Sequence, residues 1–578
     1  MIPAFCLALV LIGGDVSGSA TADQQFQTLA DEYFAGYFAF QPQRAVGLGF
    51  HHYDGKLADF SRDSLAKERD RLREFQKRLA TVDADKLGSS ARTDFRMLEI
   101  GVRTEVFNFE GLDAFRRNPM TYPQAISLNI YLSRNFAPLA DRVRSIIAIQ
   151  RQTPRLFAVA RENLQPTLSR QLVETAIKVT NGLASFVEKD LPKGVAELKD
   201  EKLLAELKAA SAIAVRELRE YVRWLETERL PKADHRFALG RDTFARMLRD
   251  LEMVTLTPEA ILDLGLRELR REQAIFAATA KLIDATKPPI EVFLAIQEDH
   301  PTAANLIPDT ARNLEAIRQF VVDRKTLSMP SDIRVTVAET PSFRRATSFA
   351  SMDSPGPFET RSTEAYYYVT PVESDWTATQ QNEWLTAFNY YTTDVVSIHE
   401  AYPGHYMQHL HLNASAAGKA AKIFSSYAFV EGWAHYTEQM LLDEGFPAGG
   451  DKLKTAKYRL AQSDEALLRL CRLCVAIKMH CDDMTVDEGT KFFQDNCYYL
   501  EQPARQEAVR GAHDPGYLFY TLGKLMILKL RSDWQKQEGK AYSLQRFHDE
   551  LLRHGAPPLP LLRQVMLKDR RAWDASLE

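Results

Sequence analysis

Two histidines six residues apart constrain the fold of this chain more than any other feature. The segment reads His399-Glu400-Ala401-Tyr402-Pro403-Gly404-His405. On an uninterrupted α-helix, six residues at about 100° each would turn the second imidazole about 120° away from the first. Pro403 removes a backbone N–H donor and Gly404 tolerates unusual dihedral angles, so the pair suits a kink or a bulge. The sequence therefore predicts a bent helix that swings His405 back toward His399.

A second motif follows at Glu431-Gly432-Trp433-Ala434-His435. Two imidazoles, a carboxylate beside the first and a second carboxylate further along are the set that a hydrolytic zinc site needs. We therefore interpret His399 and His405 as zinc ligands. His405 and His409 are four residues apart and form a competing pair, but that pair leaves Glu400 without a role.

Glu431 is the predicted third ligand, because a catalytic zinc ion keeps three protein ligands and one open position. Gly432 and Ala434 would let another helix approach closely, and Trp433 belongs in a packed interior. A carboxylate buried there needs a cation, although an ordinary acid on a helix surface is the simpler alternative. His435 and Glu438 are candidates for holding a ligand in place, and both suit ordinary helix positions equally well.

Glu400 is the predicted general base, which would take a proton from zinc-activated water and deliver it to the leaving amine. The developing oxyanion needs a further donor. Tyr520 is the first candidate, because Asp514-Pro515-Gly516 presents a Tyr-rich helix start at a loop-to-helix edge. Arg510 is the second candidate, and it would alternatively pair with a carboxylate of the substrate.

The two motifs resemble those of the bacterial domain-of-unknown-function 885 family, which is grouped with zincin-type metallopeptidases. The resemblance extends through further segments, strongest after about residue 350: Glu465–Arg472, Asp514–Tyr517, Tyr520–Lys524 and Phe547–Leu552. It implies a mainly α, multi-helix zincin-like metallopeptidase with a small β-sheet beside the metal site and a deep cleft between helical lobes. Where the family pattern leads us to expect Asp-x-Gly-x-His, this chain has Ala476–His480, so we assign no site role to His480.

Composition is compatible with a large folded protein. The chain has 578 residues, of which 45% are hydrophobic and 10% aromatic, enough to bury a large core around one cleft. Its formal charge of -4 is spread along the chain, so nothing indicates a nucleic-acid partner.

Residues 1–22 are predicted to be a signal peptide, with an apolar run from Ile2 to Ile12 and cleavage before Asp23. The run is too short to span a bilayer, no later segment resembles a membrane helix, and Cys6 lacks the small-residue context of a lipoprotein cleavage site. We therefore expect a periplasmic or secreted protein without stable membrane insertion. The sequence does not predict an oligomeric state.

The remaining cysteines, Cys471, Cys474, Cys481 and Cys497, fall within one stretch. In an oxidising compartment this clustering favours one or two disulfides, with free buried thiols or a second metal site as alternatives. The sequence does not choose a pairing.

Helical periodicity fills roughly residues 60 to 280. An amphipathic pattern runs from Leu207 to Leu225, and Thr257-Pro258-Glu259 opens another helix with a cap, a first-turn proline and an early acid. Pro288-Pro289 is the best boundary, which predicts an N-terminal helical lobe over 23–290 and a catalytic lobe over 291–578.

Strand patterns are scarce and precede the histidine motif. Ile333–Val337 alternates strictly and Tyr366–Val369 is aromatic and β-branched, so both suit a small sheet. By analogy with zincins, an edge strand of this sheet would bind extended substrate. Residues 383–402 are predicted to form one long helix that delivers His399 and Glu400 near its end.

Three functions are compatible with these observations. The first is a zinc metallopeptidase that cleaves short peptides, a substrate class implied by the family grouping. The second is a zinc hydrolase acting on a non-peptide amide or ester. The third is a zinc-stabilised protein that binds peptides without cleaving them, which a fourth protein ligand such as His409 or His435 would favour.

Overall fold

The computed structural model describes residues 21–578 apart from 342–344, 346–348, 374, 570, 572–576 and 578. The predicted signal peptide lies outside the described residues, except for Thr21 and Ala22. Thr21 caps the first helix, accepting a hydrogen bond from the N–H of Gln24. Among the described residues, no helix combines the length and apolarity that crossing a membrane requires.

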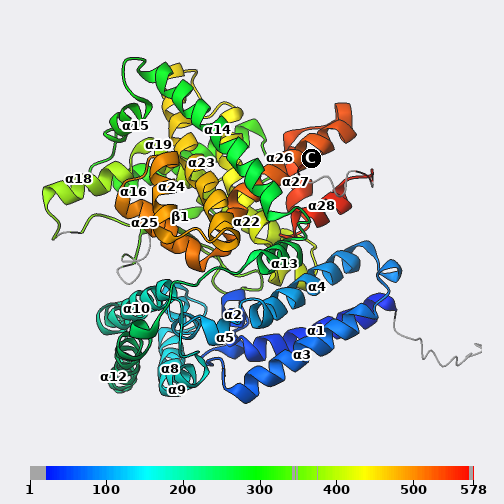
Figure 1. Ribbon diagram of the computed structural model, residues 1–578, viewed down its shortest axis with the longest axis vertical. Coiled ribbons are helices and arrows are strands. Elements are labelled where there is room, and N and C mark those ends of the chain that lie inside the picture. Colours follow the sequence, from blue (N-terminus) through cyan, green and yellow to red (C-terminus); the bar gives the residue numbers. More distant parts are fainter. Residues whose placement is uncertain are drawn as a thin grey trace, which may run out of the picture.

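The chain is mainly helical, and its N-terminal helices form two apolar cores (Figure 1). The first core joins α1 (Ala22–Phe40), α2 (Pro42–Leu48), α3 (Arg62–Ala80) and α4 (Ser89–Glu110). The second joins α5 (Ala114–Arg117), α6 (Thr121–Gln124), α7 (Ile130–Ser133), α8 (Leu139–Gln150), α9 (Thr153–Asn163), α10 (Arg170–Ser185), α11 (Leu191–Gly194) and α12 (Glu201–Trp224). The predicted amphipathic helix from Leu207 to Leu225 is confirmed as part of α12 up to Trp224, and Leu225 begins the π-helical turn that follows.

Most of the remaining helices build the largest core, in the upper part of Figure 1. They are α13 (Arg241–Glu252), α14 (Pro258–Ile283), α15 (Pro289–Gln297), α16 (Leu306–Arg324), α18 (Ala378–Ala387), α19 (Tyr390–Glu400), α20 (His405–Ala414), α22 (Tyr427–Asp443), α23 (Lys452–Cys481), α24 (Val486–Cys497), α25 (Glu501–His513), α26 (Phe519–Glu538), α27 (Leu544–Leu552) and α28 (Leu559–Met566). The short helix α21 (Lys419–Ile423) belongs instead to the first N-terminal core. Thr257 caps α14 as predicted, since its side chain accepts a hydrogen bond from the N–H of Ala260.

The cores divide the chain nearer residue 240 than residue 290. Buried residues of α13 and α14, such as Phe244 and Phe276, belong to the same core as α23. In return, α21 packs against α4, where Ala421 donates its N–H to the Asp94 carboxylate at 2.9 Å. The lobe boundary at Pro288-Pro289 stays a prediction, and α15 begins there.

One three-stranded sheet lies before α18. Its strands are β1 (Val335–Glu339), β2 (Ala350–Asp353) and β3 (Ala365–Val369), in the order β1-β3-β2, with β1 parallel and β2 antiparallel to β3. Both predicted strands are present, although β1 begins two residues later than its sequence pattern. Strand β2 was not predicted, and it forms one edge of the sheet.

Two predictions about local structure are wrong. Residues 383–402 form two helices, because Asn389 accepts a hydrogen bond from the N–H of Thr392 at 3.0 Å and starts α19 after α18 has ended. The four cysteines are free thiols, not disulfides. Cys471 and Cys474 lie inside the apolar core on α23, where a thiol packs as a small hydrophobic group, and burial raises the pKa of Cys474 to about 12.

Helices α22 and α26 touch through two glycines. A Cβ atom on Gly523 would lie 1.8 Å from the Ala428 carbonyl oxygen, and one on Gly432 would lie 2.5 Å from the Gly523 carbonyl carbon. Both contacts are with backbone atoms, so a repacked side chain cannot relieve them. The predicted close approach at Gly432 is therefore confirmed, and it places Glu431 and Tyr520 on adjoining helices.

We expect Gly523→Ala to destabilise the protein by about 3 kcal/mol or more, because the added methyl group forces α22 and α26 apart. Gly182→Ala in α10 is the matched control, since a Cβ atom there meets nothing within 4 Å. Thermal unfolding of both variants measures the effect. A Gly523→Ala melting temperature equal to that of Gly182→Ala would refute the close contact.

Candidate metal centre

The chain breaks between the two histidines. Helix α19 ends at Glu400 and α20 begins at His405, so the predicted single bent helix is instead two helices. The Gly404 N–H donates to the Ile398 carbonyl oxygen at 3.0 Å, which turns the chain back on itself. A Cβ atom on Gly404 would lie 1.8 Å from the His399 carbonyl oxygen, so only glycine fits this turn.

Helix α22 brings Glu431 to the same place. The buried Glu252 carboxylate accepts hydrogen bonds from the N–H groups of Tyr427 at 2.8 Å and Ala428 at 3.3 Å, which fixes the start of α22. The indole N–H of the fully buried Trp433 donates to the Pro403 carbonyl oxygen at 3.1 Å. Trp433 therefore lies in the interior as predicted and holds α22 against the break.

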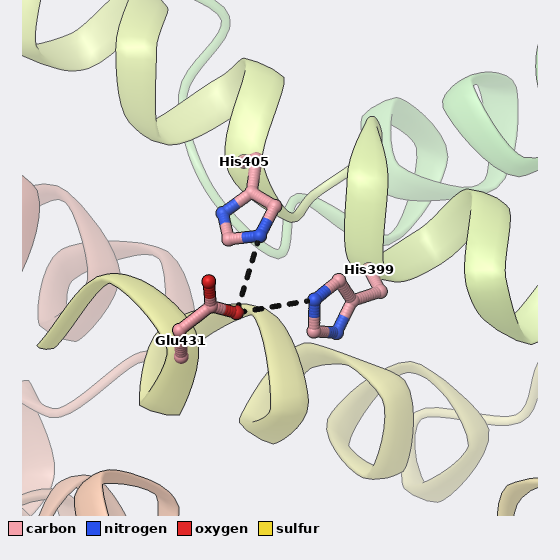
Figure 2. A group of neighbouring side chains, drawn as sticks. All are labelled: His399, His405 and Glu431. Atoms are coloured by element: carbon pink, nitrogen blue, oxygen red, sulfur yellow. Dashed lines mark ion pairs between the residues drawn. The ribbon is translucent and has the colours of Figure 1, made fainter. Parts of the chain in front are cut away.

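Three side chains from α19, α20 and α22 converge on one point (Figure 2). The Nε2 atoms of His399 and His405 each lie 3.5 Å from Oε2 of Glu431. The two imidazole rings are perpendicular, with centroids 4.8 Å apart. The structure thus brings together the three residues that the sequence singled out as ligands.

This arrangement fits a tetrahedral metal ion. Ligand atoms about 2.1 Å from zinc lie about 3.4 Å from one another, close to the separations found here. Oε2 of Glu431 is buried and has no hydrogen-bond partner, so its negative charge needs a cation bound beside it. Among the described residues, the group of possible ligands contains these three and no fourth protein ligand.

A buried carboxylate orients the first ligand. Nδ1 of His399 donates to Oε1 of Glu438 at 2.7 Å, which leaves Nε2 as the ring nitrogen directed toward Glu431. Burial alone would lower the pKa of His399, but Glu431 and Glu438 outweigh it and raise that pKa to about 9. The centre therefore favours positive charge at this position.

Glu438 is in turn held by two further side chains. Its Oε2 accepts a hydrogen bond from Nδ1 of His435 at 3.0 Å, and Arg469 contacts Oε1 at 3.3 Å. Burial alone would raise the pKa of Glu438, but Arg469 and His435 hold it well below its usual value. Glu438 is thus a carboxylate, and the two candidate supporting residues, His435 and Glu438, lie behind His399.

Two other histidines stand apart from the ligand group. His409 lies one turn after His405, and burial lowers its pKa to about 4. His480 packs elsewhere: its Nδ1 accepts the Leu239 N–H at 3.3 Å and its Nε2 donates to the Gly511 carbonyl oxygen at 2.9 Å. These contacts give His480 a structural role, as its departure from the family pattern suggested.

Glu400 faces the edge of the sheet. The Thr370 N–H donates to the carbonyl oxygen of Phe349, just before β2, at 3.0 Å, so the backbone groups of residue 349 point toward β3. This direction alternates from one residue to the next along a strand, so the backbone groups of Met352, three residues later, point away from β3. Its N–H donates to Oε2 of Glu400 at 3.3 Å. The open edge of β2 therefore borders the predicted general base.

Tyr520 closes another side of the centre. Its ring stacks near the His399 ring, with centroids 6.4 Å apart and planes 17° from parallel. Burial and the nearby Glu431 raise the pKa of Tyr520, while Arg510 and Arg472 lower it. The phenol therefore stays protonated at neutral pH and is able to donate a hydrogen bond.

The guanidinium group of Arg510 lies against the Tyr520 ring, with its Cζ atom 5.8 Å from the ring centroid. Nε and Nη2 contact Oδ2 of Asp514 at 3.2 and 3.1 Å, and Nη2 contacts the Tyr427 hydroxyl at 3.4 Å. Arg510 thus contacts Tyr520, which in turn lies beside His399, and the sequence did not predict this indirect contact with the centre.

Other contributors could not be identified from local patterns. Arg469 lies 31 residues after Glu438 and also has its Cζ atom 5.8 Å from the Tyr520 ring centroid. Met352 precedes Glu400 by 48 residues. Neither residue type nor spacing distinguishes them from ordinary helix or strand residues.

Comparisons with known proteins agree on the fold. A solved structure of "a putative lipoprotein of unknown function" from Shewanella oneidensis has a TM-score of 0.78 at 22% identity, covering 95% of this chain and 100% of that one. A second structure, of "the putative lipoprotein" from Colwellia psychrerythraea, has a TM-score of 0.79 at 18% identity, covering 96% and 100%. At these identities the likeness establishes a shared fold. No curated protein matches the chain.

A family model described as "Bacterial protein of unknown function (DUF885)" matches residues 42–566, which include every residue of the candidate centre. This match confirms the resemblance noted from the histidine and Glu-Gly-Trp-Ala motifs. The chain belongs to the DUF885 family of bacterial proteins.

Proposed function

We propose that this protein is a zinc-dependent hydrolase, and specifically a metallopeptidase that cleaves short peptides. The observation that carries the proposal is the convergence of His399, His405 and Glu431, with a buried Glu431 oxygen that lacks a hydrogen-bond partner. The zincin grouping of the family, which implied peptides as substrates, remains part of this proposal.

His399, His405 and Glu431 would hold the ion through two imidazole nitrogens and one carboxylate. Zinc bound there supplies a Lewis acid that lowers the pKa of a water molecule and polarises a carbonyl oxygen. Glu438 keeps Nδ1 of His399 protonated, so that Nε2 is the nitrogen that would bind the ion.

Glu400 would take a proton from the attacking water at its carboxylate and deliver it to the leaving nitrogen. Overall the peptide C–N bond breaks, the water oxygen stays on the carbonyl carbon as a carboxylate, and both water protons leave on the amine as ammonium. The Tyr520 hydroxyl, protonated and beside the His399 ring, would donate a hydrogen bond to the oxyanion. The open edge of β2 at Met352 would pair with an extended peptide.

The lack of a fourth protein ligand among the described residues argues against the zinc-stabilised binding protein, whose metal site would be closed. The non-peptide amide or ester hydrolase keeps the same centre and differs only in its substrate. We propose a periplasmic or secreted location, which agrees with the predicted signal peptide and with the lipoprotein description of the two similar structures.

Removing the metal should abolish peptide hydrolysis, because the Lewis acid that activates the attacking water is then lost. The test is hydrolysis of a mixture of short unmodified peptides before dialysis against a chelator, after it, and after adding one equivalent of zinc. We expect loss of activity and its recovery with zinc. Cleavage that survives complete metal removal would rule out the proposed function, and cleavage of modified amides or esters alone would favour the second hydrolase.

A further inference from the structure

A cavity of about 980 Å³ lies between the N-terminal and C-terminal halves of the chain. Its walls come from α10, the segment 235–240, the start of α24 and one face of α25. Neither His399 nor Glu431 lines it, but Arg510 does. Because Arg510 also contacts the Tyr520 ring, which faces His399, this one side chain connects the cavity with the candidate metal centre.

The cavity wall is more basic than acidic. Among the described residues that line it, five are Lys or Arg and three are Asp or Glu. The basic ones are Arg170, Lys178, Arg236, Arg505 and Arg510. The lining also includes apolar side chains such as Phe237, Val486 and Val509. Ion pairs with neighbouring acids already balance much of this positive charge, at Arg170, Arg236, Arg505 and Arg510. An anionic group attached to a partly apolar chain would therefore be bound by individual guanidinium groups beside the apolar side chains.

Three arginines surround Tyr520, and Arg510 alone of the three is placed to meet a ligand. Arg472 makes a two-pronged contact with Glu507 at 2.7 and 2.8 Å, and Arg469 contacts Glu438 and Glu465. Both have side chains less than a tenth exposed. The Arg510 side chain contacts Asp514, Tyr427 and Tyr520, but unlike the other two arginines it is 32% exposed and lines the cavity.

We propose that Arg510 binds the C-terminal carboxylate of the peptide, so that the protein removes short C-terminal fragments. This inference rests on the proposed function. A guanidinium group is planar and forms paired, charge-assisted hydrogen bonds with a carboxylate, as Arg510 already does with one Asp514 oxygen. Arg510 Cζ lies 5.8 Å and the His399 ring centroid 6.4 Å from the same Tyr520 ring centroid, so a carboxylate bound by Arg510 lies a short fragment away from the bond that is cleaved.

The test compares a short peptide of uncharged residues with its C-terminal amide. In the zinc-loaded enzyme we expect kcat/KM to be about 10- to 100-fold higher for the free carboxylate, the range of one charge-assisted contact. Arg510→Gln should remove this preference by lowering the rate for the free peptide, and Arg510→Lys should restore part of it. Isothermal titration of both peptides into the Glu400→Gln protein should show the same preference without turnover.

Arg246→Gln is the matched control. Arg246 also bonds an Asp four residues later, at 2.9 Å, with a side chain 33% exposed, but it lies on α13 away from the cavity. The Arg246→Gln variant should leave the preference for the free carboxylate unchanged. Equal melting temperatures of Arg246→Gln and Arg510→Gln would show that both variants are folded. Equal cleavage of peptide and amide by the wild type would overturn this inference while leaving the proposed peptidase in place. Cleavage of neither peptide would contradict the proposed function, and this inference with it.

Discussion

Replacing Glu400 by Gln should lower kcat for peptide hydrolysis by about 100- to 10,000-fold, the usual contribution of a general base. Gln keeps the size of the side chain and an oxygen that accepts the Met352 N–H, but it cannot take a proton. The zinc content should remain that of the wild type, because Glu400 is outside the ligand group. Metal analysis and steady-state kinetics on the same preparation measure both quantities.

Glu465→Gln is a useful comparison for this variant. Glu465 is also a partly buried acid of the same region, but it contacts Arg469 rather than the sheet edge. We expect it to keep far more activity than Glu400→Gln. A Glu400→Gln protein with near-normal turnover would remove the general-base assignment, while one that loses zinc would make Glu400 a ligand.

Replacing His405 by Ala should remove both bound zinc and activity. Two ligands, His399 and Glu431, remain in that variant, too few for a catalytic zinc site. The stabilisation that zinc gives the folded protein, about 3 kcal/mol at a zinc concentration a hundred times the Kd, should disappear as well. Thermal unfolding with and without added zinc, together with metal analysis, measures this loss.

His409→Gln is the control for His405→Ala, since it changes a histidine one turn later on the same helix. It should keep zinc and the zinc-dependent rise in melting temperature, because His409 lies outside the ligand group. If His409→Gln lost zinc and His405→Ala kept it, the ligand assignment would be wrong.

Local sequence rules predicted the parts of the centre that depend on neighbouring residues. Pro403 and Gly404 between the two histidines indicated that no straight helix could hold them, and the structure ends one helix and starts another there. The break is sharper than the predicted bend, because the Gly404 turn packs against the His399 carbonyl group. In the same way, the neighbouring residues Gly432 and Trp433 indicated that α22 is buried and closely packed.

Contacts between distant segments could not be predicted in this way. The approach of Gly432 to Gly523 and of Met352 to Glu400 depends on how whole helices and strands pack, which periodicity does not encode. The helical pattern over 383–402 reads as continuous, because Asn389 lies between Phe388 and Tyr390 and only the hydrogen bond that it accepts from the Thr392 N–H marks the start of α19. The clustering of the cysteines and the expected compartment favoured disulfides over free thiols, whereas the core around α23 accommodates Cys471, Cys474 and Cys497 as buried thiols.

The central claim is that His399, His405 and Glu431 hold one zinc ion with a position left open. Anomalous diffraction at the zinc absorption edge, from crystals of protein loaded with one equivalent of zinc, tests this most directly. We predict a single peak about 2.0 to 2.2 Å from Nε2 of each histidine and from the Glu431 carboxylate, without a fourth protein ligand. A peak elsewhere in the molecule, or no peak between these three side chains, would contradict the account.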